Sequence, residues 1–332
     1  MSGSWPVSGW ADRRVLITGG AGFLGSNLAH ALAERGARLT LIDSFEPDGG
    51  ANAANLAGLP DSVRLVRGDL RTLEGLERLL GETEFLFNLA GLTSHKGSME
   101  EPFRDLSVNT TAQLRLAEAV RASGAKPHVV HASTRQFYGR PRYLPVDEEH
   151  PLDPPDVNGI TKLAGERLWL LYGRIYGFKV AALRLTNCYG PRVRIRDGRQ
   201  NFIGLWIRHL LTNAPFEIWG GAQLRDLAYA EDVVAALLAA AEHEAATGRP
   251  LNLGGCPALS LRQLAERLVA AHGGGRFEIR PFPEAQKAID IGSYEADDRT
   301  FRAATGWRPR IDIDEGMART LAYFRPRLAA YL

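Results

Sequence analysis

Several features that would place this chain in a special class of protein are scarce or missing. Only two of its 332 residues are cysteines, Cys188 and Cys256, and their spacing suits neither a disulfide framework nor a metal site. No apolar run reaches the roughly 18 residues that a membrane-spanning helix needs, and the first dozen residues hold no signal-peptide pattern. We therefore expect a cytoplasmic protein that has no membrane partner and binds no metal.

A strong charge of either sign is also lacking. Forty lysines and arginines stand against 38 aspartates and glutamates, so the formal net charge is only +2. Sequence-independent binding to nucleic acid usually needs a dense positive surface, so we expect no nucleic-acid partner. A small phosphate-bearing ligand is compatible with this balance.

Glycine, in contrast, is abundant, with 35 residues against a usual share of roughly 7%. Short apolar runs alternate with segments of helical period through the first half of the chain. The predicted strands are 15–17, 39–42, 63–66, 85–87 and 129–130, and the predicted helices are 24–35, 73–80 and 108–121. This alternation predicts an α/β fold with a Rossmann-type doubly wound parallel sheet.

The pattern loosens after about residue 185. A strand at 216–219 and helices at 203–211, 232–242 and 261–271 are still predicted there. We expect a Rossmann domain in residues 1–185 and a smaller α/β domain for the substrate in residues 186–332. Some exchange of strands or helices back to the first domain is part of this expectation.

A glycine-rich turn follows the first predicted strand. Gly19, Gly22 and Gly25 have dinucleotide-binding spacing, and Phe23 and Leu24 between them open a helix. The first glycine permits the turn, the second lets the backbone approach a pyrophosphate, and the third allows close helix–sheet packing. The helix N-terminus adds N–H groups and the positive end of its dipole. The spacing alone is weak evidence, because a glycine-rich loop can be an ordinary turn.

Asp43 ends the second predicted strand. In dinucleotide-binding folds a carboxylate there accepts hydrogen bonds from the adenosine ribose and repels a 2′-phosphate, which favours NAD over NADP. The alternative is a helix-capping or loop residue, since carboxylates are common at strand ends.

Further motifs occur in order along nearly the whole chain. They are Gly68-Asp69-Leu70, Asn88-Leu89-Ala90-Gly91, Val108-Asn109, Ser133-Thr134, Phe137-Tyr138-Gly139, the segments 162–166, 184–192 and 225–232, and Gly306-Trp307. With the glycine turn, this set resembles the extended short-chain dehydrogenase/reductase family, specifically its NAD-dependent nucleotide-sugar epimerases and dehydratases. The resemblance implies NAD as cofactor and a homodimer formed through a helix pair.

The same resemblance assigns cofactor contacts to individual residues. Asp69 and Leu70 would contact the adenine, and Lys162 would hold the nicotinamide ribose. The other cofactor-binding residues that it implies are Leu89, Ala90 and Asn109.

The catalytic positions depart from the family pattern at one place. Thr134 stands where the family has its catalytic serine or threonine. The family's proton-accepting tyrosine, four residues before Lys162, is replaced by Asn158 in a segment that needs no gap to overlay. An amide cannot ionise, so Asn158 could orient a hydroxyl or a water but not act as the base.

Two explanations of this replacement compete. Either another group supplies the base, with Asp156, His95, Tyr138 and water-coupled Lys162 as candidates, or the protein binds NAD and ligand without turnover as a sensor or scaffold. A keto-reductase of nucleotide sugars is a further alternative. Losing a positioned base typically costs about 10²–10⁴ in rate. Because Thr134, Lys162 and the substrate motifs remain, we favour an active enzyme.

An arginine-rich segment, 184–199, holds five arginines against one aspartate and suggests an anionic ligand, although a solvated loop is the alternative. The resemblance sharpens the anion into the diphosphate of a UDP- or dTDP-linked sugar. Lys287 stands where the family has a second phosphate-binding arginine. The substrate-binding residues expected here are Asn187, Arg192, Asn201, Arg225 and Lys287.

The two residues after Thr134 bear on the type of reaction. The family's dehydratases carry Asp-Glu there and its decarboxylases carry Glu at the second place, whereas this chain has Arg135-Gln136. Neither side chain is a carboxyl acid or base, so we expect epimerisation: hydride transfer from a sugar carbon to bound NAD, a keto intermediate, and reduction on the other face. Arg135 is a further expected substrate contact, with a sugar carboxylate as one possible ligand and packing over the loop as the alternative.

Overall fold

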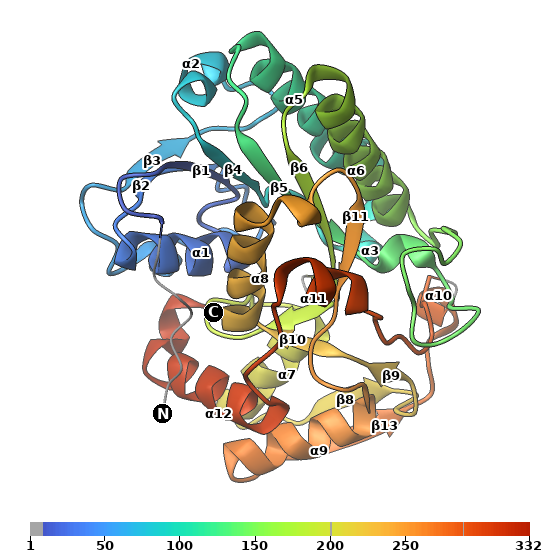
Figure 1. Cartoon of the computed structure of the whole chain (residues 1–332). Helices are drawn as coiled ribbons and strands as arrows, with labels where there is room; N and C mark the ends of the chain where they lie inside the picture. Colours follow the sequence, from blue (N-terminus) through green and yellow to red (C-terminus); the bar gives the residue numbers. More distant parts are fainter. Residues whose placement is uncertain (1–8, 200, 288) are drawn as a thin grey trace.

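A seven-stranded sheet forms the centre of the molecule in the computed structural model, which describes residues 9–199, 201–287 and 289–332 (Figure 1). Its strands are β1 (Arg14–Thr18), β2 (Arg38–Asp43), β3 (Arg64–Arg67), β4 (Phe85–Asn88), β5 (His128–Thr134), β6 (Val180–Leu185) and β11 (Pro250–Leu253). They stand in the order β3-β2-β1-β4-β5-β6-β11, and every neighbouring pair is parallel. The predicted Rossmann-type doubly wound sheet is confirmed.

Helices cover both faces of this sheet. Along β1, Val15 and Ile17 pack toward α1 (Phe23–Glu34) and α8 (Ala230–Glu242), while Leu16 packs on the opposite face, because successive strand side chains alternate. The opposite face is covered by α2 (Leu76–Gly81), α5 (Ala112–Ala122) and α6 (Val157–Tyr176). Shorter helices on the connections are η1 (Ala53–Leu56), α3 (His95–Glu100), α4 (Pro102–Leu106), η2 (Ser107–Thr111) and η3 (Gln136–Tyr138).

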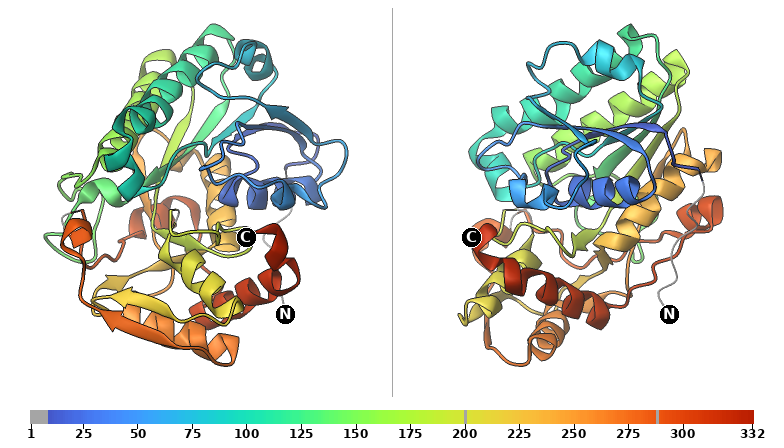
Figure 2. Two further views of the ribbon diagram at one scale, coloured as in Figure 1. Left: turned by 180° about the vertical axis from the view of Figure 1, so that it is seen from behind. Right: turned by 90° about the vertical axis from the view of Figure 1, so that its left-hand side faces the viewer.

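Most of the chain after β6, apart from the segments around α8 and β11, builds a smaller layer below the carboxyl ends of the strands (Figure 2). It has three strand pairs: β7 (Asn187–Tyr189) with β10 (Leu227–Tyr229), β8 (Phe216–Trp219) with β13 (Phe277–Arg280), and β9 (Leu224–Arg225) with β12 (Leu259–Ser260). Its helices are α7 (Phe202–Leu211), α9 (Leu261–His272), α10 (Glu284–Lys287), α12 (Ile313–Phe324) and η5 (Arg325–Ala330). The helices η4 (Glu244–Ala246) and α11 (Arg299–Thr305) pack beside α8 and β11 at the main sheet. Trp206, Phe216 and Phe324 belong to one apolar core there.

Predicted and observed elements differ mainly at their ends. The strand predicted at 216–219 is β8, and the predicted helix 24–35 is α1 shifted by one residue. The predicted helix 108–121 instead begins as the π-helical turn η2 and continues as α5. Within the described residues, no helix is both long and apolar enough to span a bilayer.

Candidate active site

A cavity opens at the carboxyl ends of the parallel strands, beside β1 and β4, between which the strand order of the sheet reverses direction. Ligands bind at such a position in doubly wound folds. Most of the predicted site residues line it. They are Gly19, Gly22, Phe23, Leu24, Gly25, Asp43, Asp69, Leu70, Leu89, Ala90, Thr134, Arg135, Asn158, Lys162, Asn187 and Asn201. The predicted residues Asn109, Arg192, Arg225 and Lys287 do not line the cavity.

The glycine turn is shaped for close backbone approach. Gly19 has a φ of +69°, and a Cβ there would lie 3.0 Å from the backbone of Leu89 and Ala90. A Cβ on Gly25 would lie 2.1 Å from the carbonyl oxygen of Gly19. Gly22 caps α1 without a side chain, so the start of the helix is open to an anion. This geometry fits the pyrophosphate of NAD.

Acidic side chains lie next to the glycine turn in the cavity wall. Asp43 accepts hydrogen bonds from the N–H groups of Ala21 and Phe45, both at 3.0 Å, and its burial raises the pKa of its carboxyl. Glu46, which lines the cavity with Asp43, pairs with Arg71 at 3.0 Å. Two carboxylates at this place disfavour a 2′-phosphate, so the residues fit NAD better than NADP. Glu46 and Arg71 belong to no motif that marked them in the sequence.

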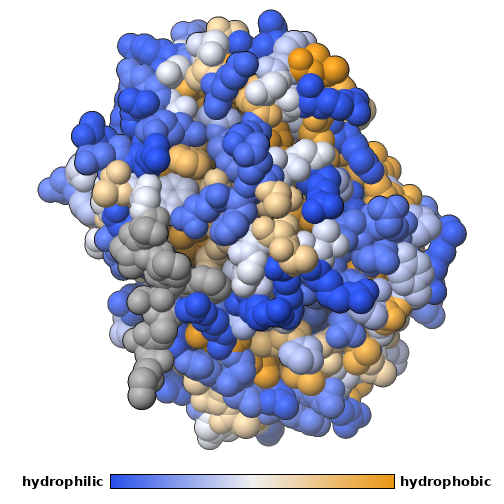
Figure 3. Space-filling view, in the orientation of Figure 1, coloured by the Kyte–Doolittle hydropathy of each residue, from blue (hydrophilic) through white to orange (hydrophobic). Residues whose placement is uncertain are grey.

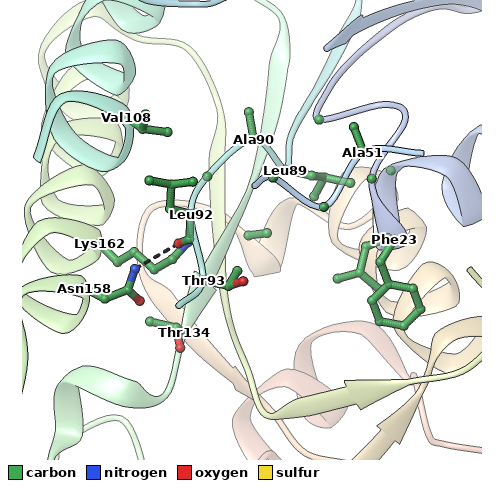
Figure 4. Close-up of a pocket in the computed structure, with 18 of the residues that line it drawn as sticks. Phe23, Ala51, Leu89, Ala90, Leu92, Thr93, Val108, Thr134, Asn158 and Lys162 are labelled. Carbon is green, nitrogen blue, oxygen red and sulfur yellow. Dashed lines mark hydrogen bonds between the residues drawn. The ribbon is translucent and has the colours of Figure 1, made fainter. Parts of the chain in front are cut away.

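Asn158 and Lys162 reach the cavity from the first turns of α6 (Figure 4). The Asn158 Nδ2 group donates to the carbonyl oxygen of Leu92 and to Oδ2 of Asp105, both at 2.9 Å. Both amide hydrogens are therefore used, and only Oδ1 is left to meet a ligand. Burial lowers the pKa of Lys162, and the charge of Asp105 opposes that shift.

Asp105 organises this end of the site from behind the cavity. It accepts hydrogen bonds from Asn109 Nδ2, at 3.0 Å, and from the hydroxyl of Thr161 in addition to Asn158. Asn109 in turn accepts from the N–H of Leu92 at 2.9 Å. Asn109 thus holds Leu92, which lines the cavity, although Asn109 itself does not line it.

His95, the first residue of α3, lines the cavity. Its Nδ1 lies 2.9 Å from Oδ2 of Asp156, the residue that caps α6 by accepting from the N–H of Gly159 at 2.7 Å. Gln136 Nε2 donates to the same Asp156 oxygen at 2.8 Å. Burial alone would raise the pKa of Asp156, but the hydrogen bonds and the charge of His95 leave it lowered.

Tyr138, another candidate base, lies outside the cavity lining. Its hydroxyl donates to Oδ1 of Asn252 at 2.7 Å and accepts from Arg184 Nη1 at 2.6 Å. Burial raises the pKa of Tyr138 to about 12. The phenol is a fixed part of the interior behind β5.

Arg135 is the predicted substrate cation that reaches the cavity lining. Its guanidinium lies 4.9 Å from the ring centroid of Tyr294, and its Nη2 donates to Oδ1 of Asn187 at 2.8 Å. Burial lowers the pKa of Arg135. Arg135 and Asn187 therefore form one rigid stretch of the wall next to Thr134.

The other predicted cations have partners elsewhere. Arg225 Nη2 pairs with Asp290 at 3.0 Å, and Arg192 Nη1 donates to Asn27 at 3.0 Å. Lys287 is exposed on α10, 3.7 Å from a glutamate of the same helix. Their expected contacts with a diphosphate stay predictions.

Comparison with known proteins identifies the family of this chain. The model of the NAD dependent epimerase/dehydratase family matches residues 15–254. A UDP-glucose 4-epimerase of Mycolicibacterium smegmatis is 30% identical over 94% of this chain and 98% of its own length.

Two solved structures extend this likeness to the fold. The UDP-glucose 4-epimerase of Thermotoga maritima with UDP-glucose has a TM-score of 0.85 at 28% identity, and it covers 95% of this chain and 99% of its own. The UDP-glucose 4-epimerase of Thermus thermophilus in complex with NAD has a TM-score of 0.83 at 29% identity, with the same two coverages. The chain therefore belongs to the NAD-dependent epimerase/dehydratase family, as its motifs implied.

Proposed function

We propose that this protein is an NAD-dependent epimerase of a nucleotide sugar, with a UDP- or dTDP-linked sugar as substrate. The observation that carries the proposal is one continuous cavity lining that joins the glycine turn to Thr134, Asn158 and Lys162. Asn187 and Asn201 line the same cavity, where a substrate would extend away from the cofactor.

NAD, when bound, accepts a hydride from a sugar carbon and returns it. Gly19, Gly22 and Gly25 would receive its pyrophosphate, and Asp43 its adenosine ribose. Lys162 would hold its nicotinamide ribose. Thr134 can hold a sugar hydroxyl through its side-chain oxygen, which already accepts a hydrogen bond from the N–H of Gln136 at 3.2 Å.

Asn158 orients rather than ionises in this proposal. Its Nδ2 hydrogens are used by Leu92 and Asp105, so the free Oδ1 can accept a hydrogen bond from a substrate hydroxyl or a water. Arg135 and Gln136 provide no carboxyl group beside Thr134, which supports epimerisation over elimination of water or loss of CO₂.

The test is incubation of the purified protein with NAD and a panel of UDP- and dTDP-sugars in heavy water, followed by NMR of the products. The expected result is a C4 epimer of at least one sugar, with transient NADH absorbance during turnover. Net reduction of a keto-sugar nucleotide in a parallel incubation with NADH in place of NAD would indicate a keto-reductase instead. Neither epimer nor NADH with any sugar, despite saturable binding, would refute the proposal and favour a non-catalytic binding protein.

A further inference from the structure

The group that replaces the family's tyrosine must present a basic atom to the cavity. Of the candidates, Tyr138 and Asp156 do not line the cavity, and Lys162 in its charged form has donors but no acceptor. His95 lines it and carries a ring nitrogen that can accept a proton.

The imidazole of His95 has one buried edge and one accessible edge. Its Nδ1 is buried against Asp156, 2.9 Å from a carboxylate that is itself fully buried, whereas 42% of the His95 side chain is exposed. At this separation Nδ1 does not yet meet the geometry of a hydrogen bond, and catalytic hydrogen bonds are often poorly aligned before a substrate is bound. Among the residues that the structure describes, none hydrogen-bonds to Nε2, so this nitrogen is available to accept a proton.

Asp156 is held firmly enough to fix the ring. Its Oδ1 accepts from the N–H of Gly159 at 2.7 Å, and its Oδ2 accepts from Gln136 at 2.8 Å. Gln136 lies two residues after Thr134, and Asp156 lies two residues before Asn158. The histidine is thus anchored to both segments that carry the predicted catalytic side chains.

A second contact joins α3 to the start of α6. Ser98, on the helix that His95 begins, accepts a hydrogen bond from the backbone N–H of Asn158 at 3.1 Å. The side chain of Asn158 also binds the carbonyl of Leu92, three residues before His95. The loop that carries His95 is therefore fastened to the start of α6 at three places.

We propose that His95 is the general base and acid of this site, and that Asp156 is its positioning residue. The inference rests on the proposed function and names the group that moves the proton. A carboxylate bound to one ring nitrogen fixes the proton there and leaves the other nitrogen free to act, which is the arrangement of carboxylate–histidine pairs in many enzymes.

In the proposed step, Nε2 of His95 would take the hydroxyl proton of the sugar CH–OH. With NAD bound, the hydride of the same carbon would go to the cofactor, and a C=O bond would form. His95 then holds one additional proton, and the positive charge of the ring is stabilised by Asp156. Return of the hydride to the other face and of the proton from Nε2 to oxygen restores the alcohol and the starting histidine.

The first test needs no turnover. Protein labelled with ¹⁵N-histidine is saturated with NAD, and the ring nitrogens of His95 are identified by their loss in His95→Gln. In the neutral ring we expect the proton on Nδ1, and addition of UDP-glucose should shift the Nε2 resonance. A proton on Nε2, or an Nε2 resonance that stays unchanged when bound UDP-glucose is saturating, would overturn the proposal whether or not the protein turns over.

The second test follows NADH formation in a single turnover with the sugar that reacts in the panel. His95→Gln should slow it by about 10²–10⁴, while the Kd of that sugar nucleotide changes less than about threefold. Asp156→Asn, which keeps an oxygen for the helix cap, should slow it by about ten- to a hundredfold and release the proton from Nδ1.

The matched control is His272→Gln, because His272 is a half-buried residue at the end of α9 that does not line the cavity. It should react like the wild type. A His95→Gln rate within about threefold of the wild type, in protein with an unchanged melting temperature, would overturn the assignment of the base while leaving the epimerase itself intact.

Discussion

A buried ion pair fastens together the motifs that surround the site. Glu166 on α6 and Arg184 on β6 are 0% and 1% exposed, with Arg184 Nη2 2.7 Å from Oε1 and Nε 3.0 Å from Oε2. Ser133, next to Thr134, donates to the same carboxylate at 2.6 Å, and Arg184 also donates to Tyr138. Burial opposes the charge of Arg184, but the hydrogen bonds and the charge of Glu166 nevertheless raise the pKa of Arg184.

We predict that Glu166→Gln lowers the free energy of unfolding by about 3–5 kcal/mol, because it leaves the charge of Arg184 buried without a counter-ion. This loss is large against a total stability of about 5–15 kcal/mol. The assay is equilibrium unfolding in urea, followed by tryptophan fluorescence, to which Trp169, buried on the same helix, contributes with the other five tryptophans.

Two comparisons make this prediction specific. Glu315→Gln removes one charge of the exposed pair with Arg319 and should cost less than about 1 kcal/mol. Glu166→Met combined with Arg184→Met removes both buried charges and should recover most of the stability lost in the single variant. A loss below about 1 kcal/mol in Glu166→Gln would refute the reasoning.

Other residues give shorter tests. Gly25→Ala places a Cβ 2.1 Å from the oxygen of Gly19, so NAD affinity measured by calorimetry should fall at least about tenfold. Asp43→Asn removes charge that repels a 2′-phosphate, so the ratio of NAD to NADP affinity should fall by about tenfold. Burial raises the pKa of Asp226 to about 6, above its value of 3.8 in the unfolded chain, so its favourable contribution is complete below pH 4 and lost as pH rises through 6. The stability of the wild type relative to Asp226→Asn, from urea unfolding, should therefore fall by up to about 3 kcal/mol between pH 4 and 7. Apolar side chains lie along α6 (Figure 3), and Ile175 there is 61% exposed; if the expected homodimer uses this helix, Ile175→Asp should yield a monomer in light scattering.

The sequence predicted best what local order decides. Strand, glycine turn and helix follow one another within residues 14–34, so the turn and its place at the end of β1 could be read directly. The Asp43 position follows from the end of the next strand. In contrast, β11 pairs with β6 across a gap of more than 60 residues, and no short-range pattern indicates that pairing.

Side-chain partners that are distant in sequence explain where the site prediction was incomplete. Arg225 lies 65 residues from Asp290, and Arg192 lies 165 residues from Asn27, so their pairings could not be read from the motifs. The same holds for His95 and Asp156, which are 61 positions apart and come together because α3 packs on the start of α6. The sequence contains all the candidate bases, but only the packing of α3 on α6 brings His95 next to Asp156.

The asparagine at position 158 and the histidine at position 95 are coupled through one loop. A tyrosine at 158 has no donor near its Cβ and would leave Oδ2 of Asp105 without a hydrogen bond, at a cost of about 1–3 kcal/mol, while the carbonyl of Leu92 would keep only its bond from Asn109 Nδ2 at 3.2 Å. The amide satisfies both, and by holding Leu92 it steadies the segment that presents His95. Asn158→Ala should therefore slow the first turnover and broaden the Nε2 resonance of His95 together. If the rate falls while that resonance stays unchanged, Asn158 acts on the substrate alone, and the coupling argued here is wrong.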